Sequence, residues 1–162
     1  MDRAKNDYRF ADSIRNDPYI GREVGEYVAQ LFDAYQEELR SANAMDFGDL
    51  LCNVVTLFKL EPSILESYQQ RFKFLLIDEY QDTNKVQYLL MRQLTGTSQN
   101  ICVVGDDDQS IYGFRGATVE TILNFKNDFP DAEVITLDTN YRSTKNILSA
   151  AHAVICKNER RH

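Results

Sequence analysis

Hydrophobic residues in the first third of the chain recur at three- and four-residue steps, the period of an amphipathic helix. From Arg22 to Leu39 this stripe consists of Val24, Tyr27, Val28, Leu31, Phe32, Tyr35 and Leu39. A second helix is predicted to begin at Asp46, a capping residue, and to bury Phe47, Leu50, Leu51, Val54, Val55 and Phe58. A third, short helix is predicted to begin at Pro62. Residues 1 to about 20 mix both charge signs with little apolar periodicity.

Beyond residue 71 the pattern changes to short apolar runs that alternate with helical stretches. The runs predict strands at 72–77, 101–105 and 133–137, and the helical stretches are 85–94, 118–125 and 144–155. Alternation with short loops is typical of a parallel sheet covered by helices, so the predicted fold class is α/β. The unbroken run from Phe74 to Ile77 indicates a strand buried on both faces.

Composition narrows the function classes. The chain has 162 residues, of which 43% are hydrophobic, so most of it should fold. A net charge of −7 argues against a protein that grips nucleic acid through bulk positive charge. Cys52, Cys102 and Cys156 have apolar neighbours and are expected to be buried, reduced thiols of a cytoplasmic protein. No apolar run reaches the roughly 18 residues of a membrane span, and the two histidines lack partners for a zinc site.

Two carboxylates follow the first predicted strand. Ligands of such sheets bind beyond the carboxyl ends of the strands, where Asp78 is placed to hold magnesium and Glu79 to orient an attacking water. The alternative is a pair of solvated acids at the start of a loop.

The second predicted strand leads into an unusual loop, Gly105 to Ala117. Its acids do not form an EF-hand, because the twelfth position counted from Asp106 is not glutamate. The amide of Gln109 can donate to a phosphate oxygen. Tyr112 and Phe114 could stack on bases, with Arg115 as a cation beside them, or the two rings could simply pack under the loop.

The third predicted strand is followed by Asn140-Tyr141-Arg142-Ser143. Arg142 is either an ordinary surface residue or an arginine finger that reaches a transferring phosphate. The ordered set of 78–84, 105–117 and 140–143, together with Met45-Asp46-Phe47-Gly48-Asp49-Leu50-Leu51, closely resembles the UvrD/Rep family of superfamily-one DNA helicases.

The resemblance implies a partial RecA-like parallel sheet flanked by helices and preceded by a helical segment. Residues 1–44 resemble the end of the insertion subdomain, 45–131 the later half of the first RecA-like domain, and 132–162 the start of the second. The implied activity is 3′–5′ translocation on single-stranded DNA and unwinding of duplex DNA, driven by ATP, in repair or replication.

Site roles are also implied by the resemblance. ATP and Mg²⁺ would be the cofactors, with Asp78 and Glu79 at the metal and Glu79 activating water. Gln109 would sense the γ-phosphate, Tyr141 would stack near the adenine, and Arg142 would be the finger from the second domain. Tyr112, Phe114 and Arg115 would contact DNA.

Three departures from the family stand out. Phe114 replaces a frequent tryptophan, and Gly48 stands where an acid is common. No glycine has another five positions later and no Gly-Lys pair occurs, so the phosphate-binding loop is missing. The chain is therefore expected to be an internal part of a helicase, inactive without the rest. A non-catalytic remnant that binds DNA or a partner, and a part of a helicase-nuclease, are the alternatives.

Overall fold

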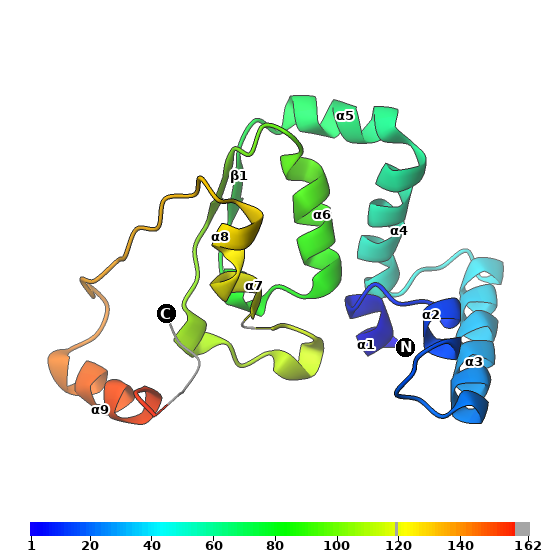
Figure 1. Ribbon diagram of the computed structural model, residues 1–162, viewed down its shortest axis with the longest axis horizontal. Helices are drawn as coiled ribbons and strands as arrows, with labels where there is room; N and C mark the ends of the chain where they lie inside the picture. The colour runs from blue at the N-terminus through cyan, green and yellow to red at the C-terminus, as the bar shows by residue number, and fades with distance from the viewer. Residues whose placement is uncertain (119, 158–162) are drawn as a thin grey trace.

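The computed structural model describes residues 1–118 and 120–157, and it is mostly helical with a small parallel sheet (Figure 1). The α-helices are α1 Asp2–Asn6, α2 Ala11–Arg15, α3 Arg22–Ser41, α4 Phe47–Leu60, α5 Pro62–Arg71, α6 Lys85–Thr95, α7 Glu120–Leu123, α8 Phe125–Asp128 and α9 Lys145–Ile155. The strands are β1 Leu75–Ile77 and β2 Ile101–Val103, and three short 3-10 helices are η1 Tyr80–Asp82, η2 Asp107–Gln109 and η3 Gly113–Arg115. None of the described helices is long and apolar enough to cross a membrane.

The predicted long helices are confirmed, and the start of α4 is fixed by the expected cap. The Asp46 side chain accepts a hydrogen bond from the Asp49 amide at 2.9 Å. The predicted buried face of α4 is partly wrong, because Phe47 and Leu50 are 89% and 52% exposed. The buried residues of this helix are Gly48, Asp49, Cys52, Val55 and Phe58, on the side that meets α1 and α6.

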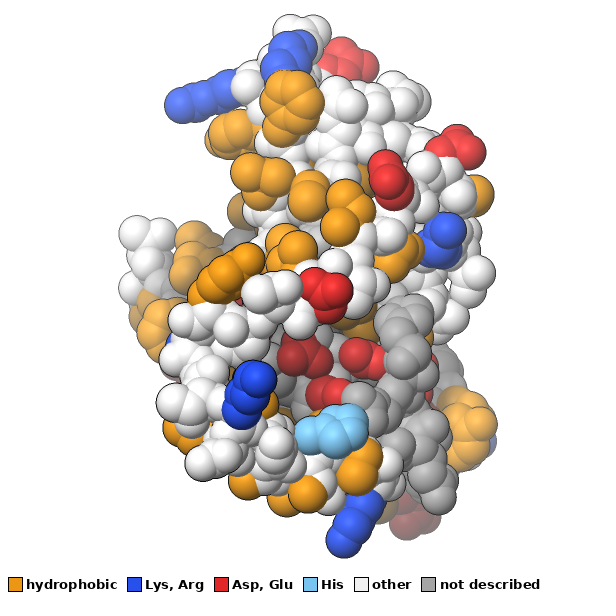
Figure 2. Space-filling model, turned by 90° about the vertical axis from the view of Figure 1, so that its left-hand side faces the viewer, with side chains coloured by type: hydrophobic (Ala, Val, Ile, Leu, Met, Phe, Trp, Pro, Cys, Tyr) orange, Lys and Arg blue, Asp and Glu red, His pale blue; other side chains and the backbone are white. Residues whose placement is uncertain are grey.

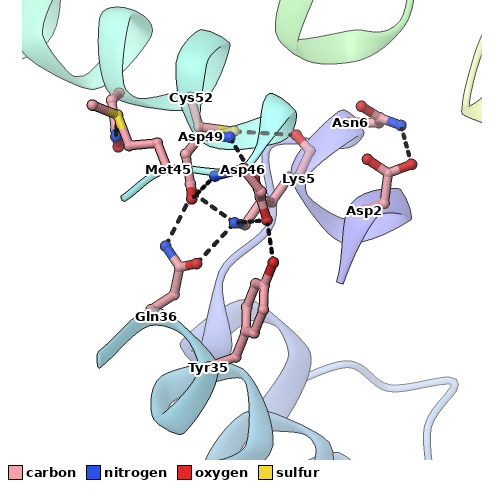
Figure 3. A network of polar contacts seen from close by, with 10 residues as sticks. Asp2, Lys5, Asn6, Tyr35, Gln36, Met45, Asp46, Asp49 and Cys52 are labelled. Carbon is pink, nitrogen blue, oxygen red and sulfur yellow. Dashed lines mark hydrogen bonds and ion pairs between the residues drawn. The ribbon is translucent and has the colours of Figure 1, made fainter. Parts of the chain in front are cut away.

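Helices α1 and α2 were not predicted, and α1 is held by a buried lysine. Lys5 is fully buried, and its Nζ lies 2.6 Å from both Asp46 Oδ2 and Asp49 Oδ1 and donates to Gln36 Oε1 at 2.8 Å (Figure 3). The Tyr35 hydroxyl donates to the same Asp46 oxygen at 3.0 Å. This Lys5 network (Lys5, Tyr35, Gln36, Asp46, Asp49) joins α1 to α3 and α4, far apart in sequence.

The sheet has two parallel strands, with Leu75 opposite Ile101 and Ile77 opposite Val103. Helices α6, α7 and α8 cover one face through a cluster centred on Tyr80, Met91 and Phe129. The prediction that β1 is buried on both faces is wrong, since Leu76 is 80% exposed. Its face is open because no described helix lies on it. Figure 2 shows hydrophobic side chains gathered above a hollow that contains acidic side chains.

The predicted third strand at 133–137 is extended chain with no ladder to the described strands. Val134, Ile135 and Leu137 are 67%, 73% and 82% exposed, because a parallel strand is buried only where neighbouring strands and helices surround it. Helix α9 is confirmed but lies away from the sheet (Figure 1). The cysteine prediction holds for Cys52 alone: Cys102 lies on the open face of β2 and Cys156 follows α9, and both are exposed free thiols.

Candidate active site at the strand ends

The end of β1 presents two exposed carboxylates. Asp78 and Glu79 follow Ile77 directly, and Asp78 Oδ1 accepts a hydrogen bond from the Glu79 amide at 3.0 Å. Glu79 adopts the left-handed conformation (φ 51°, ψ 42°), which is uncommon for a residue with a side chain and is shared here with Tyr8, Asn43 and Gln99. This turn directs the chain from the strand into η1, so that the two acids stand at the tip of the strand.

A buried glutamine joins the ends of β1 and β2. Gln81 is 1% exposed; its Nε2 donates to Glu79 Oε2 at 2.7 Å and its Oε1 accepts from the Asp106 amide at 3.0 Å. Asp106 Oδ2 in turn accepts from Gln109 Nε2 at 2.7 Å. The structure therefore connects Glu79 to Gln109 through two intermediate residues.

Gly105 makes this close approach possible. A Cβ added at Gly105 would lie 2.7 Å from Gln81 Oε1 and 2.8 Å from Ile122 Cδ1. Any larger side chain would push Gln81 away from the Asp106 amide. Gly105 begins the loop predicted to carry the site, but Gln81 was not predicted as a site residue. Its signal was present, because an amide two residues after Glu79 has both the donor and the acceptor needed to join two strand ends.

The electrostatics of the site are acidic. Burial raises the pKa of Asp82, and the negative charge of nearby Glu79 raises it further. One oxygen of Asp82 is buried without a hydrogen-bond partner. A cation bound at Glu79 would offset this repulsion between carboxylates.

The donor set suits Mg²⁺ bound together with phosphate. Mg²⁺ is usually held through one or two carboxylates, with substrate phosphates and waters as its other ligands. Asp78 supplies an exposed carboxylate at the strand end with Glu79 beside it. Across 1–118 and 120–157, no group of three or more metal-ligating side chains could hold an ion unaided. The chemistry of Asp78 and Glu79 therefore fits Mg²⁺ if phosphate or water oxygens supply its other ligands.

The predicted DNA-contact loop lies beyond η2. The rings of Tyr112 and Phe114 are 5.8 Å apart with a 39° interplanar angle, and they are 37% and 74% exposed. Phe114 is thus exposed at the surface rather than buried under the loop. The side chain of Arg115 lies outside the described residues.

Arg142 and Tyr141 are placed elsewhere. Both are exposed, Tyr141 to 94%, and the Arg142 amide is bound by Asn140 Oδ1 at 2.9 Å. They precede α9, which stands apart from the sheet (Figure 1). The structure thus brings Glu79 and Gln109 together, but no recorded contact joins Arg142 to them.

Comparisons with known proteins identify the family to which the chain is similar. The profile of the UvrD/REP helicase N-terminal domain matches residues 1–130. The ATP-dependent DNA helicase UvrD1 of Mycobacterium tuberculosis (strain H37Rv) is 51% identical over 138 residues, which are 81% of this chain and 18% of UvrD1. The ATP-dependent DNA helicase PcrA of Staphylococcus epidermidis (strain RP62A) is 51% identical over 134 residues, 83% of this chain and 18% of PcrA. PcrA of Staphylococcus aureus (strain NCTC 8325) is 50% identical with the same coverage.

The chain thus spans less than a fifth of the length of these relatives. The profile match covers most of the chain, from α1 through α8, and includes both strand ends with Asp78, Glu79 and Gln109. On this evidence the chain belongs to the UvrD/REP helicase family.

Proposed function

We propose that the chain is a portion of an ATP-dependent 3′–5′ DNA helicase, a motor that couples ATP hydrolysis to movement along single-stranded DNA. The observation that carries this proposal is the hydrogen-bonded connection from Glu79 through Gln81 and Asp106 to Gln109. It joins two polar strand ends at one edge of a parallel sheet, which is where such sheets bind ligands. Residues 45–131 would be the later half of a RecA-like domain, with 1–44 as the end of its helical insertion and 132–162 as the start of a second RecA-like domain.

In this role Asp78 would hold Mg²⁺, with Glu79 close by. Bound MgATP supplies the terminal phosphoryl group that is transferred to water. Glu79 would orient the attacking water and accept its proton, and the bond from Gln81 fixes the direction of the Glu79 carboxylate. Gln109 would contact the γ-phosphate with its amide, which Asp106 orients.

DNA would be contacted by the loop that follows Gln109. Only two residues separate Gln109 from Tyr112, so a shift at the phosphate has a short covalent path to the rings of Tyr112 and Phe114. Stacking of bases on such rings is worth about 1–3 kcal/mol per base, and in a chain of net charge −7 it would be a local contact. Arg115 would add a phosphate contact.

Tyr141 and Arg142 would complete the nucleotide site from the second domain, the tyrosine beside the adenine and the arginine on the transferring phosphate. Their exposure supports a role that begins only when more of that domain surrounds residues 133–137. The motor would also need a phosphate-binding loop, which this sequence lacks. We therefore expect no DNA-stimulated ATP hydrolysis from the chain alone.

A chimera tests the proposal. The region of S. epidermidis PcrA that matches this chain is replaced by the chain's own residues, and ATP hydrolysis is measured with and without oligothymidylate. We expect a DNA-stimulated ATPase whose kcat falls about 10²- to 10⁴-fold with Glu79→Gln. Glu66→Gln, an exposed acid on α5, is the matched control and should change nothing. A folded chimera that is inactive, or equally active with Glu79→Gln, would refute the proposal.

A further inference from the structure

Helix α1 contacts two parts of the molecule through neighbouring residues. Lys5 points into the Lys5 network and fastens α1 to α3 and α4 (Figure 3). Its backbone carbonyl also accepts from Cys52 Sγ at 3.3 Å. Lys5 is fully buried and held by three side-chain acceptors, so α1 is fastened to both α3 and α4.

Asn6, the next residue, contacts the opposite side. Asn84 Nδ2 donates to Asn6 Oδ1 at 3.3 Å, a bond between residues 78 positions apart. Asn84 also caps α6 by accepting from the Gln87 amide, so its side chain is fixed at both ends. In Figure 1, α1 lies beside the loop that leads from β2 to α7.

The same contact reaches the end of the candidate DNA-contact loop. Gly116 turns the chain in the left-handed region (φ +84°), and its added Cβ would lie 3.5 Å from Asn6 Cβ. Ala117, 5% exposed, forms an antiparallel bridge with Asn84. The Gly116 amide bonds to Gly113 O at 3.1 Å and the Ala117 amide to Tyr112 O at 3.4 Å. Where Gly116 and Ala117 are held therefore decides where the rings of Tyr112 and Phe114 stand.

We propose that Asn6 is a positioning residue that sets the Tyr112–Phe114 ring pair for single-stranded DNA and couples it, through Lys5, to helix α3. The proposal rests on the proposed function, because it takes the ring pair as the DNA contact. Asn6 need not touch DNA in this account; it acts through Asn84 and Gly116.

The test uses the full chain with Phe114→Trp as a reporter, since the natural chain contains no tryptophan. Base stacking on the new indole quenches its fluorescence, so titration with oligothymidylate at low salt measures binding at this ring. Asn6→Ala removes the bond to Asn84 and also the bond that Asn6 Nδ2 donates to Asp2 Oδ2 at 3.4 Å. Asp2→Ala removes only the second of these bonds and separates their effects. Asn6→Asp keeps an acceptor oxygen and serves as the rescue variant. Asn127→Ala is the matched control, because it removes an exposed asparagine–asparagine bond of 3.0 Å on α8.

We expect Asn6→Ala to weaken binding about three- to tenfold, the usual value of one hydrogen bond, while Asn6→Asp and Asn127→Ala bind as the reporter chain does. Hydrogen exchange at the Gly116 and Ala117 amides should be faster in Asn6→Ala, with the thermal midpoint close to that of Asn127→Ala. Unchanged binding in Asn6→Ala would overturn the inference and leave the proposed function standing.

If the reporter chain itself does not bind oligothymidylate, the proposed DNA contact at the ring pair is the part that fails. The positioning role is then decided by exchange alone. Faster exchange at Gly116 and Ala117 in Asn6→Ala, restored by Asn6→Asp, supports it, and equal exchange in all variants overturns it.

Discussion

Residues 1–131 and residues 132–157 use similar hydrophobic patterns with different outcomes. The first region holds three clusters of buried side chains and the Lys5 network. In the second region no described residue is buried, although α9, like α3, is amphipathic. An amphipathic pattern therefore specifies a helix, but burial requires a second surface. The first region provides that surface itself, and within the described part of the chain the second does not.

The predicted site residues are also divided between the two regions. Asp78, Glu79 and Gln109 are already connected in the first region, whereas Tyr141 and Arg142 lie in the second. If the proposed function holds, a site divided in this way would be completed only when the two parts meet around a nucleotide.

The largest expected effect comes from the Lys5 network. Lys5→Met leaves Asp46 and Asp49 without their cation and should destabilise the first region by about 3 kcal/mol, because a buried charge without its partner is costly. Urea unfolding followed by circular dichroism measures this loss. Lys126→Met, an exposed lysine on α8, is the control. Equal stability of the two variants would mean that the network does not hold the region together.

Low pH should remove much of the difference in stability between the natural chain and Lys5→Met. Burial raises the pKa of Asp46, but hydrogen bonds from Lys5, the Asp49 amide and Tyr35 outweigh burial and hold the pKa below its usual 3.8. A carboxyl with a lowered folded pKa contributes stability above its unfolded pKa and loses it as the pH falls through the folded value. The stability gap between the natural chain and Lys5→Met should therefore narrow below about pH 3.8 in urea titrations at stepped pH. A gap that widens in acid would contradict this.

At high pH the stability that Lys5 contributes is lost as the pH rises, the opposite of the trend for Asp46. Burial lowers the pKa of Lys5, but hydrogen bonds to Asp46 and Asp49 outweigh it and raise the pKa above its usual 10.5. The contribution of Lys5 is thus complete below 10.5 and is lost as the pH rises through the raised value.

A smaller effect is expected at Gly48. A Cβ there would lie 2.8 Å from Lys5 Cδ and 2.9 Å from Lys5 Cβ, and the buried lysine stem cannot move away easily. Gly48→Ala should therefore cost about 1–3 kcal/mol in urea unfolding, the usual cost of overpacking. Gly113→Ala meets nothing within 4 Å and is the matched control. Full stability of Gly48→Ala would show that the stem of Lys5 is mobile.

The smallest effect is expected in the second region. Leu137 is 82% exposed, so Leu137→Ser should change the midpoint of thermal unfolding little, corresponding to less than about 0.5 kcal/mol. A loss as large as that of a buried residue would place 133–137 inside a core and end the contrast between the regions.

Local signals allowed the sequence to predict the local structure. The cap Asp46, the opening Pro62 and the apolar spacing of α3, α4 and α6 act within one or two turns, and these helices were predicted. Adjacent strand ends followed from the strand–helix alternation, so Glu79 and Gln109 could be placed near each other. Long-range partners could not be predicted. In the sequence Lys5 is one charge in a mixed polar segment. Its acceptors Gln36 and Asp46 lie 31 and 41 positions away, and Asp49 lies farther still.

The strand predicted at 133–137 fails for the same reason. Its β-branched residues Val134, Ile135 and Thr136 have strand propensity, but neither neighbouring strands nor a covering helix are available among the described residues. Leu76 on β1 is exposed for the same reason, because no described element covers its face of the strand.

Hydrogen exchange along the whole chain, followed by mass spectrometry, tests the central contrast most directly. The account predicts that amides of α4, β1 and α6 resist exchange up to the free energy of global unfolding, while amides from 133 to 157 exchange at nearly the rate of an unfolded peptide, since an unsupported eleven-residue helix is marginal in water. Protection of α9 equal to that of α4 would contradict it, because the second region would then be packed and Arg142 would already have a fixed place.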